Sequence, residues 1–336
     1  MNPRKLNSYP EFRDITSEVA QFHNYHGEYK TTDKNYVIYS RLGEVFNESE
    51  IIDVCNSFKD KKLAILTTRK YPQSLVKDYD CKIFTIPSGY AYYTTEMPQI
   101  KTNFDRHFDK IVLSLNNRAQ WNRHALWHCV INFKLQDRFY FSYLMADRYN
   151  QGKRVLYNQM TEEVGKTWFN DQLDIDKIYH ELPVSIDMFF DNDWGPGNIS
   201  YYENSFSSFV NETYIEQNYN PFLTEKTFKP IAYGHPMLLF SSAGALQLLK
   251  ELGFKTYDVI FDESYDLIES PQVRFETLLK LLLDLCQKNN NQLEEMYKTI
   301  QPTLEYNYNF FWNELHDQYK TEVTVVKDQV LNFLNL

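Results

Sequence analysis

Residues 220–240 of this 336-residue chain have the sequence NPFLTEKTFKPIAYGHPMLLF. Thr224 is a suitable N-cap residue, so the spacing predicts a helix over residues 226–232, with Pro230 in about its first turn, where a missing N–H costs least. The Gly-His-Pro turn leads into the apolar run 237–240, which is typical of a buried strand. A helix that turns directly into a strand indicates an α/β fold with a parallel sheet.

The same alternation continues on both sides of this stretch. Apolar or β-branched runs typical of strands occupy residues 36–39, 63–66, 82–86, 111–115 and 207–210. Segments with helical spacing occupy residues 48–61, 123–135 and 245–252, the last closed by Gly253. Residues 143–198 have a weak pattern and suggest an irregular insertion, and the chain is mostly helical from Val273 onward. At roughly 100–200 residues per domain, we expect two Rossmann-like domains.

The composition excludes several classes of protein. Hydrophobic residues make up 43% and charged residues 24%, which excludes disordered, collagen-like and disulfide-dense chains. No apolar stretch approaches the ~20 residues of a membrane span, and the N-terminus lacks the apolar core of a signal peptide. The four cysteines form no CxxC pair, so we expect free thiols and a cytoplasmic location. Aromatic residues reach 16%, and either fill the cores or line an acceptor site.

The net charge of −10 argues against a protein whose main task is to bind nucleic-acid backbones. The charge is unevenly distributed, because residues 101–154 contain ten basic and four acidic side chains. This basic segment is either a solvated face or part of an anion-binding site.

The start of the predicted helix after Thr224 suits a nucleoside diphosphate. A helix N-terminus offers free N–H groups and partial positive charge, and Lys226 adds a full positive charge for a phosphate. The carboxylate of Glu225 can accept two hydrogen bonds from a ribose diol. The alternative is a capping pair on an exposed helix.

Two upstream segments also pass from a strand into polar residues. They are residues 110–123, KIVLSLNNRAQWNR, and residues 206–213, FSSFVNET. Together with Thr224-Glu225-Lys226, these segments resemble the donor-binding half of GT-B glycosyltransferases, most closely the α1,3-fucosyltransferase type and related viral and bacterial sugar transferases. The resemblance covers roughly residues 107–260, but the loop between the second and third segments is longer than in the fucosyltransferases.

The resemblance implies a GT-B fold, in which two Rossmann-like domains face a cleft. Residues 1–105 would bind the acceptor, residues 106–300 would bind the nucleotide-sugar donor, and terminal helices in 301–336 would pack back on the first domain. The residues at or beside the positions that bind the donor are Asn117, Arg118, Arg123, Asn211, Glu212, Thr224, Glu225 and Lys226.

The implied activity is transfer of a hexosyl or pentosyl group from a nucleoside-diphosphate sugar to a glycan or other hydroxyl acceptor. Inversion at the anomeric carbon is implied by the same resemblance, and no metal or cofactor is required. We choose Glu44 as the base, with Glu28 and Glu96 as comparable candidates. The expected location is the cytoplasm of a bacterium or a virus-infected cell.

Two other functions remain open, namely a phage-type enzyme that glycosylates a hydroxymethylated DNA base and a non-catalytic GT-B-like binding protein. A metal-dependent GT-A enzyme would instead use Asp191-Asn-Asp193. His124 and His128 have a permissible zinc spacing, but no third ligand is suitably placed, so we predict no metal site. The acidic cluster around Glu263 and Asp266 is either a solvated loop or a sugar contact.

Overall fold

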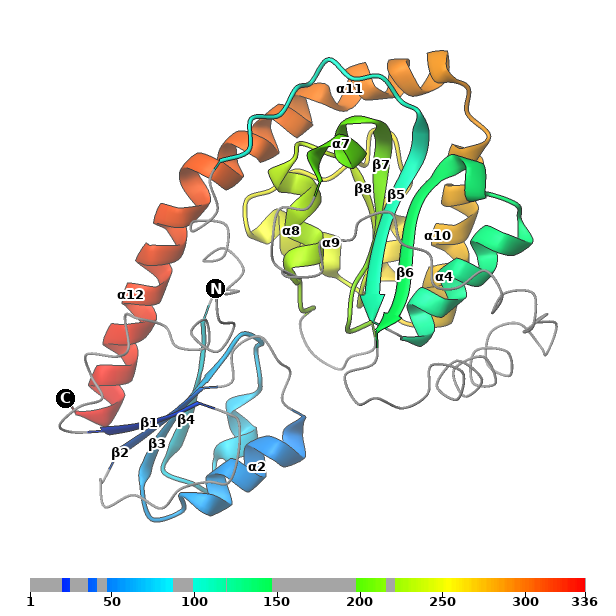
Figure 1. The fold of residues 1–336 in the computed structure, drawn as a ribbon. Coiled ribbons are helices and arrows are strands. Elements are labelled where there is room, and N and C mark those ends of the chain that lie inside the picture. The colour runs from blue at the N-terminus through cyan, green and yellow to red at the C-terminus, as the bar shows by residue number, and fades with distance from the viewer. Residues whose placement is uncertain are drawn as a thin grey trace. The chain divides into compact units, whose positions relative to one another are not determined.

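The computed structural model of the chain describes residues 20–24, 36–40, 47–86, 99–118, 120–146, 198–215 and 221–335 (Figure 1). The chain divides into two compact units. Unit 1 comprises Met1–Glu96, Asn218–Phe222 and Asn313–Leu336, and unit 2 comprises Met97–Gln217 and Leu223–Trp312. Each unit contains a parallel sheet with covering helices, so the predicted α/β class is confirmed.

The sheet of unit 1 has four parallel strands in the order β1-β2-β3-β4. They are β1 (Ala20–Asn24), β2 (Tyr36–Ser40), β3 (Lys62–Thr67) and β4 (Cys81–Thr85), with a 3₁₀ turn over Gln73–Val76. Helix α2 (Glu48–Ser57) begins at a capping box formed by Asn47 and Glu50. Its apolar side, including Ile51, packs into one core with Val37 and Leu63.

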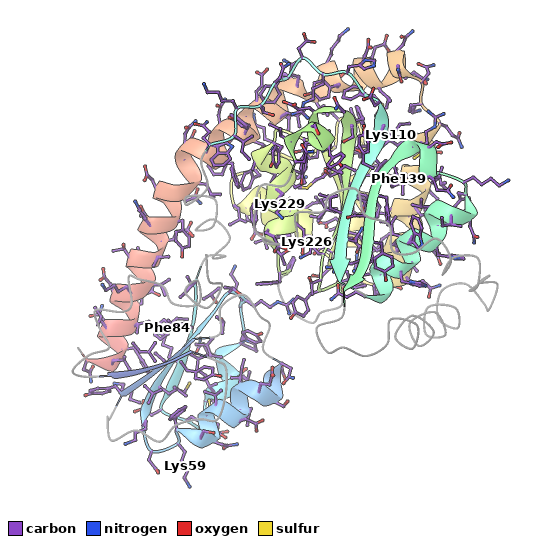
Figure 2. The ribbon with its side chains drawn as sticks, in the orientation of Figure 1. Lys59, Phe84, Lys110, Phe139, Lys226 and Lys229 are labelled. Carbon is purple, nitrogen blue, oxygen red and sulfur yellow. The ribbon has the colours of Figure 1, made fainter. Side chains whose placement is uncertain are left out.

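The other face of this sheet carries helix α12 (Leu315–Leu334). The ring of Phe333 packs edge-on against Phe84, with 5.8 Å between the ring centroids, and Figure 2 labels Phe84 beside this helix. Val330 and Leu334 of the helix are fully buried. Because both faces are covered, the central strands β2 and β3 have nearly continuous apolar sequences rather than alternating ones.

Unit 2 contains a second parallel sheet, in the order β6-β5-β7-β8. Its strands are β5 (Lys110–Arg118), β6 (Phe139–Ala146), β7 (Ser205–Asn211) and β8 (Met237–Phe240). Its α-helices are α4 (Trp121–Asn132), α7 (Ile199–Glu203), α8 (Glu225–Ala232), α9 (Ala245–Glu251), α10 (Pro271–Cys286) and α11 (Asn290–Asn309). Short 3₁₀ turns cover Gln136–Arg138 and Glu263–Leu267, and a π-helical turn, Phe310–Glu314, joins α11 to α12.

Figure 1 shows α8 on one face of this sheet and α4 with α10 on the other. The predicted strand over residues 237–240 is confirmed, as is the left-handed C′ glycine, Gly253, which has a φ of +99°. Pro230 was placed wrongly, because it lies in the second turn of α8. At that position proline has no backbone N–H to donate to the carbonyl oxygen four residues earlier.

Among the described strands and α-helices, β1, α7 and β6 were not predicted, and neither were the short 3₁₀ and π-helical turns. The predicted irregular segment begins at residue 143, but β6 continues to Ala146. Most of the predicted insertion, residues 147–197, lies outside the described residues.

Candidate functional site

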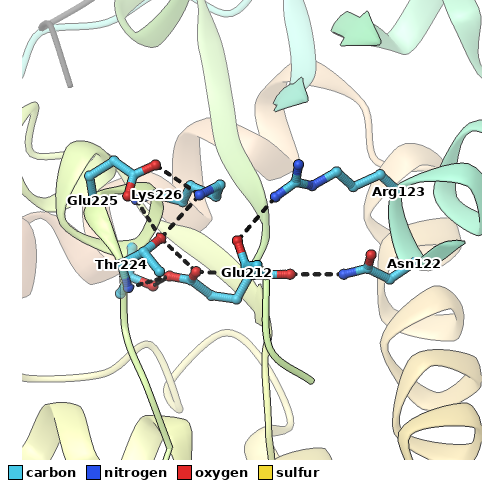
Figure 3. A network of polar contacts seen from close by, with 8 residues as sticks. Asn122, Arg123, Glu212, Thr224, Glu225 and Lys226 are labelled. Carbon is cyan, nitrogen blue, oxygen red and sulfur yellow. Dashed lines mark hydrogen bonds and ion pairs between the residues drawn. The ribbon is translucent and has the colours of Figure 1, made fainter. Parts of the chain in front are cut away.

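The two central strands of the unit 2 sheet form a topological switch point. β5 pairs with β6 on one side and with β7 on the other, so the chain leaves β5 through α4 and leaves β7 through α8 in opposite directions. Open parallel sheets bind ligands at the carboxyl ends of strands where successive connections diverge in this way. The first turns of α4 and α8, with the residues that follow β7, therefore form the candidate site (Figure 3).

Glu212 is the central residue of this site. It follows the last residue of β7, is fully buried, and accepts four hydrogen bonds through its carboxylate. One oxygen accepts from the backbone N–H of Thr224 at 2.8 Å and the hydroxyl of Thr227 at 2.6 Å. The other accepts from the Thr224 hydroxyl at 2.6 Å and the Thr213 N–H at 3.3 Å. The carboxylate therefore fixes the start of α8 to the end of β7.

Thr224 is the N-cap of α8, and its hydroxyl oxygen accepts from the backbone N–H of Lys226 at 3.3 Å. The ammonium group of Lys226 donates to the same hydroxyl at 3.3 Å and to a carboxylate oxygen of Glu225 at 2.8 Å. The side chains of Lys226 and Glu225 are 26% and 14% exposed, respectively. A solvent-accessible ion pair therefore lies at the N-terminus of this helix.

Charge around Glu225 keeps its carboxylate ionised. Burial acts to raise the pKa of Glu225, but the positive charges of Lys226 and Lys229 and the hydrogen bond from Lys226 outweigh it, so the net pKa is lowered. Figure 2 labels Lys226 and Lys229, which lie on the same helix. Lys229 lies four residues after Glu225, a spacing that brings side chains together on one helix face.

A second polar contact joins the first turn of α4 to the end of β7. The side-chain amide of Asn122 donates to the Asn211 side-chain oxygen at 2.7 Å and to the Glu212 carbonyl at 2.8 Å. The Asn211 amide returns a hydrogen bond to the Asn122 carbonyl at 3.1 Å. Arg123, only 2% exposed, extends from the same turn to the Thr213 hydroxyl at 3.4 Å. The three segments are thus tied together by buried polar side chains.

The structure brings together six of the donor-site residues predicted from the sequence. They are Arg123, Asn211, Glu212, Thr224, Glu225 and Lys226. Asn117 and Arg118 are the last two residues of β5, beside a register shift against β6, and their side chains lie outside the description. Glu44, the predicted base, also lies outside the described residues, as do Glu28, Glu96 and the segment 191–193.

Sequence reasoning missed Asn122 and the two threonines, Thr213 and Thr227, that contact Glu212 or Arg123. Of these three residues, only Asn122 could have been selected from the sequence, because it directly precedes Arg123, which begins a predicted helix. Thr213 and Thr227 have ordinary positions in the sequence, and their contacts depend on the meeting of β7 with α8.

The two histidines of α4 are buried and neutral. Burial, with a contribution from His128, lowers the pKa of His124 to about 3, and burial lowers that of His128 to about 4. A ring nitrogen of His128 lies 2.7 Å from the side-chain amide of Asn132. Across the described segments, three or more His, Cys, Asp or Glu side chains nowhere gather closely enough to hold a metal ion.

The acidic cluster after residue 261 serves local structure. Asp266 is 6% exposed, and its carboxylate accepts from the backbone N–H groups of Leu246 and Gln247 at the start of α9. Glu263 accepts from the Tyr257 N–H and the Thr256 hydroxyl, both at 2.7 Å. The expectation of a solvated loop is therefore wrong for these two carboxylates.

The loops at this edge of the sheet are also joined by Arg274 of α10, which is 1% exposed. Its guanidinium donates to four backbone carbonyl oxygens. They belong to Ile215, at 2.6 Å, Ser241, at 2.8 Å, Glu269, at 3.2 Å, and Ile268. One side chain therefore connects the segments that follow β7 and β8 with the start of α10.

A scan against protein-family models and a search of curated protein sequences each returned no match. Among the described residues, no helix combines the length and the apolar character that a bilayer span requires.

Proposed function

We propose that the chain is a glycosyltransferase that takes its sugar from a nucleoside diphosphate. One observation carries the proposal. The three segments that resemble the donor half of the GT-B enzymes are far apart in sequence, yet Arg123, Glu212 and Lys226 meet at the switch point of a parallel sheet. Ligands of open α/β sheets bind at such a point.

In the proposed site, Lys226, Arg123 and the N-terminus of α8 bind the diphosphate, because they supply two full positive charges and the partial charge of a helix end. Glu225 binds the ribose diol through its ionised carboxylate. The side chains of Glu212 and Asn211 are already committed to buried hydrogen bonds, so we assign them positioning roles rather than contacts with the donor.

The proposed reaction displaces the nucleoside diphosphate with an acceptor hydroxyl. The acceptor oxygen forms a bond to the anomeric carbon, the bond from that carbon to the diphosphate oxygen breaks, and the hydroxyl proton passes to a carboxylate base, for which Glu44 remains our prediction. Arg123 and Lys226 would stabilise the departing diphosphate without requiring a metal ion. An inverting, GT-B-type enzyme, with unit 1 for the acceptor and unit 2 for the donor, follows from the resemblance.

The proposal is tested by a thermal-shift screen of UDP, GDP, CDP, ADP and their sugars, with and without EDTA. A ligand at 100 times its Kd stabilises the folded state by about 2.7 kcal/mol, so one nucleotide series should raise the Tm of the wild type by several degrees, equally with EDTA present. Lys226→Ala should reduce this shift to half or less, because tenfold weaker binding leaves about 1.4 kcal/mol of stabilisation at the same ligand concentration. Lys280→Ala, an exposed charge change on α10, should not. No shift with any nucleotide would refute the proposed function.

The acceptor is tested separately with the nucleotide sugar that binds. Turnover with any acceptor hydroxyl would exclude the non-catalytic alternative. Strong, salt-dependent binding to duplex DNA would favour the enzyme that modifies a DNA base, because such binding depends on contacts with phosphates.

A further inference from the structure

We propose that the ion pair between Glu225 and Lys226 makes the site selective for ligands that present a ribose diol and a phosphate together. Free phosphate or pyrophosphate would then be rejected, and so would a nucleotide that lacks the 2′-hydroxyl. This inference rests on the proposed donor site.

The ion pair occupies both of the groups that the donor needs. The Lys226 ammonium lies 2.8 Å from the Glu225 carboxylate and 3.3 Å from the Thr224 hydroxyl, so two of its three N–H groups have partners before a ligand arrives. Thr224 cannot move aside, because Glu212 holds both its N–H and its hydroxyl. Glu225 is the member that we expect to exchange partners, because its carboxylate is bonded to Lys226 rather than to the buried Glu212.

A phosphate that approaches Lys226 alone meets the negative charge of Glu225. Like charges held at such short range in a partly buried site repel each other strongly, which is a penalty against binding of an isolated anion. The carboxylate must also lose its hydrogen bond from the ammonium group, and pyrophosphate offers it no donor in return. Binding of an anion alone is therefore opposed by repulsion and by a lost hydrogen bond.

A nucleoside diphosphate removes both penalties. The two hydroxyls of its ribose can donate to the Glu225 carboxylate, and its phosphate can take the place of that carboxylate at Lys226. Lys229, four residues further along α8, provides a second positive charge that favours the ionised carboxylate in either arrangement. The ribose and the phosphate therefore bind cooperatively, through the exchange of one ion pair for two new contacts.

The test measures binding of pyrophosphate, of the nucleoside diphosphate that binds best, and of its 2′-deoxy form, by calorimetry on the full chain. The variants are Glu225→Gln and Glu225→Ala, with Glu276→Gln as a matched control. Glu276 lies on the exposed side of α10 and accepts a hydrogen bond from Gln272, so the control makes the same charge change elsewhere. Melting curves establish that each variant is folded.

We expect both Glu225 variants to bind pyrophosphate at least tenfold more tightly than the wild type and the ribonucleotide at least tenfold more weakly. The preference for ribose over deoxyribose should shrink towards unity in Glu225→Ala, and the control should match the wild type. If the wild type binds the nucleotide but the Glu225 variants gain no affinity for pyrophosphate, the selectivity inference is wrong and the donor site stands. If the wild type binds no nucleotide, the proposed function itself fails.

Discussion

The substitution Glu212→Gln tests the buried network at its centre. A glutamine side chain keeps one carbonyl oxygen, which can still accept from the Thr224 N–H and the Thr227 hydroxyl. Its NH₂ group would face the Thr213 N–H and the Thr224 hydroxyl, which already accepts two hydrogen bonds from Lys226. Two of the four bonds to the carboxylate are therefore lost or mismatched, and the buried charge that strengthens the others is removed.

Hydrogen bonds to ionised groups contribute about 1.5–3 kcal/mol each, so we expect Glu212→Gln to lower the free energy of unfolding by about 3 kcal/mol. For units of this size, a loss of 1 kcal/mol lowers Tm by about 2–4 °C, so the expected decrease in Tm is about 6–12 °C. Thermal and urea unfolding followed by circular dichroism measure both quantities. Glu276→Gln should stay within about 0.5 kcal/mol of the wild type. A Glu212→Gln protein that melts within about 2 °C of the wild type would contradict the network.

Three further substitutions should change the free energy of unfolding or its pH dependence. Gly234→Ala should cost about 1–3 kcal/mol, because φ is +57° and the added Cβ would lie 2.6 Å from the ring of Phe104, and Phe104→Ala should recover part of that loss in the double mutant. Arg274→Lys should cost about 2–4 kcal/mol in urea unfolding, since one ammonium cannot reach all four carbonyls, and an unchanged midpoint would refute its role. The pKa of His128 is about 4 in the folded state and about 6.5 in the unfolded state. Between these two pH values only the unfolded state binds a proton, so the free energy of unfolding decreases as the pH falls from 6.5 to 4. His128→Gln should flatten that pH dependence by about 2–3 kcal/mol between pH 7 and pH 4.5, and a slope equal to that of the wild type would argue against a buried neutral imidazole.

The elements predicted correctly are those whose signals are local. The run 237–240 forms a strand because all four of its apolar side chains are buried in a sheet, and Gly253 ends α9 because its φ of +99° favours glycine. Thr224, Glu225 and Lys226 are neighbours in the chain, so capping rules alone place them around one helix start. Pro230 was misplaced because it is the sixth residue counted from Glu225, the first residue of α8, and so lies beyond the first turn.

The residues that were missed make contacts over long sequence separations. Asn122 and Asn211 are 89 residues apart, and their reciprocal hydrogen bonds depend on the order of strands in the sheet. Asp266 was expected on the surface because its neighbours are acidic. It is buried because the start of α9 supplies N–H donors to its carboxylate, which its own sequence context does not indicate.

The aromatic residues in unit 2 have a largely structural role among the described residues. The rings of Tyr202 and Tyr233 stack with centroids 4.1 Å apart, and Phe108 packs edge-on against Phe206 at 5.4 Å. All four side chains are buried. These contacts support the expectation that much of the aromatic content fills cores, as large rings do in most domains.

Calorimetric titration of the wild type and of Lys226→Ala with UDP, GDP, CDP and ADP tests the central claim most directly. We predict that one of the four binds the wild type with 1:1 stoichiometry, that Lys226→Ala weakens it at least tenfold, and that Lys280→Ala leaves it unchanged. Equal affinity of the wild type and Lys226→Ala for that nucleotide, or no binding of any of the four, would contradict a nucleotide-sugar site at the N-terminus of α8.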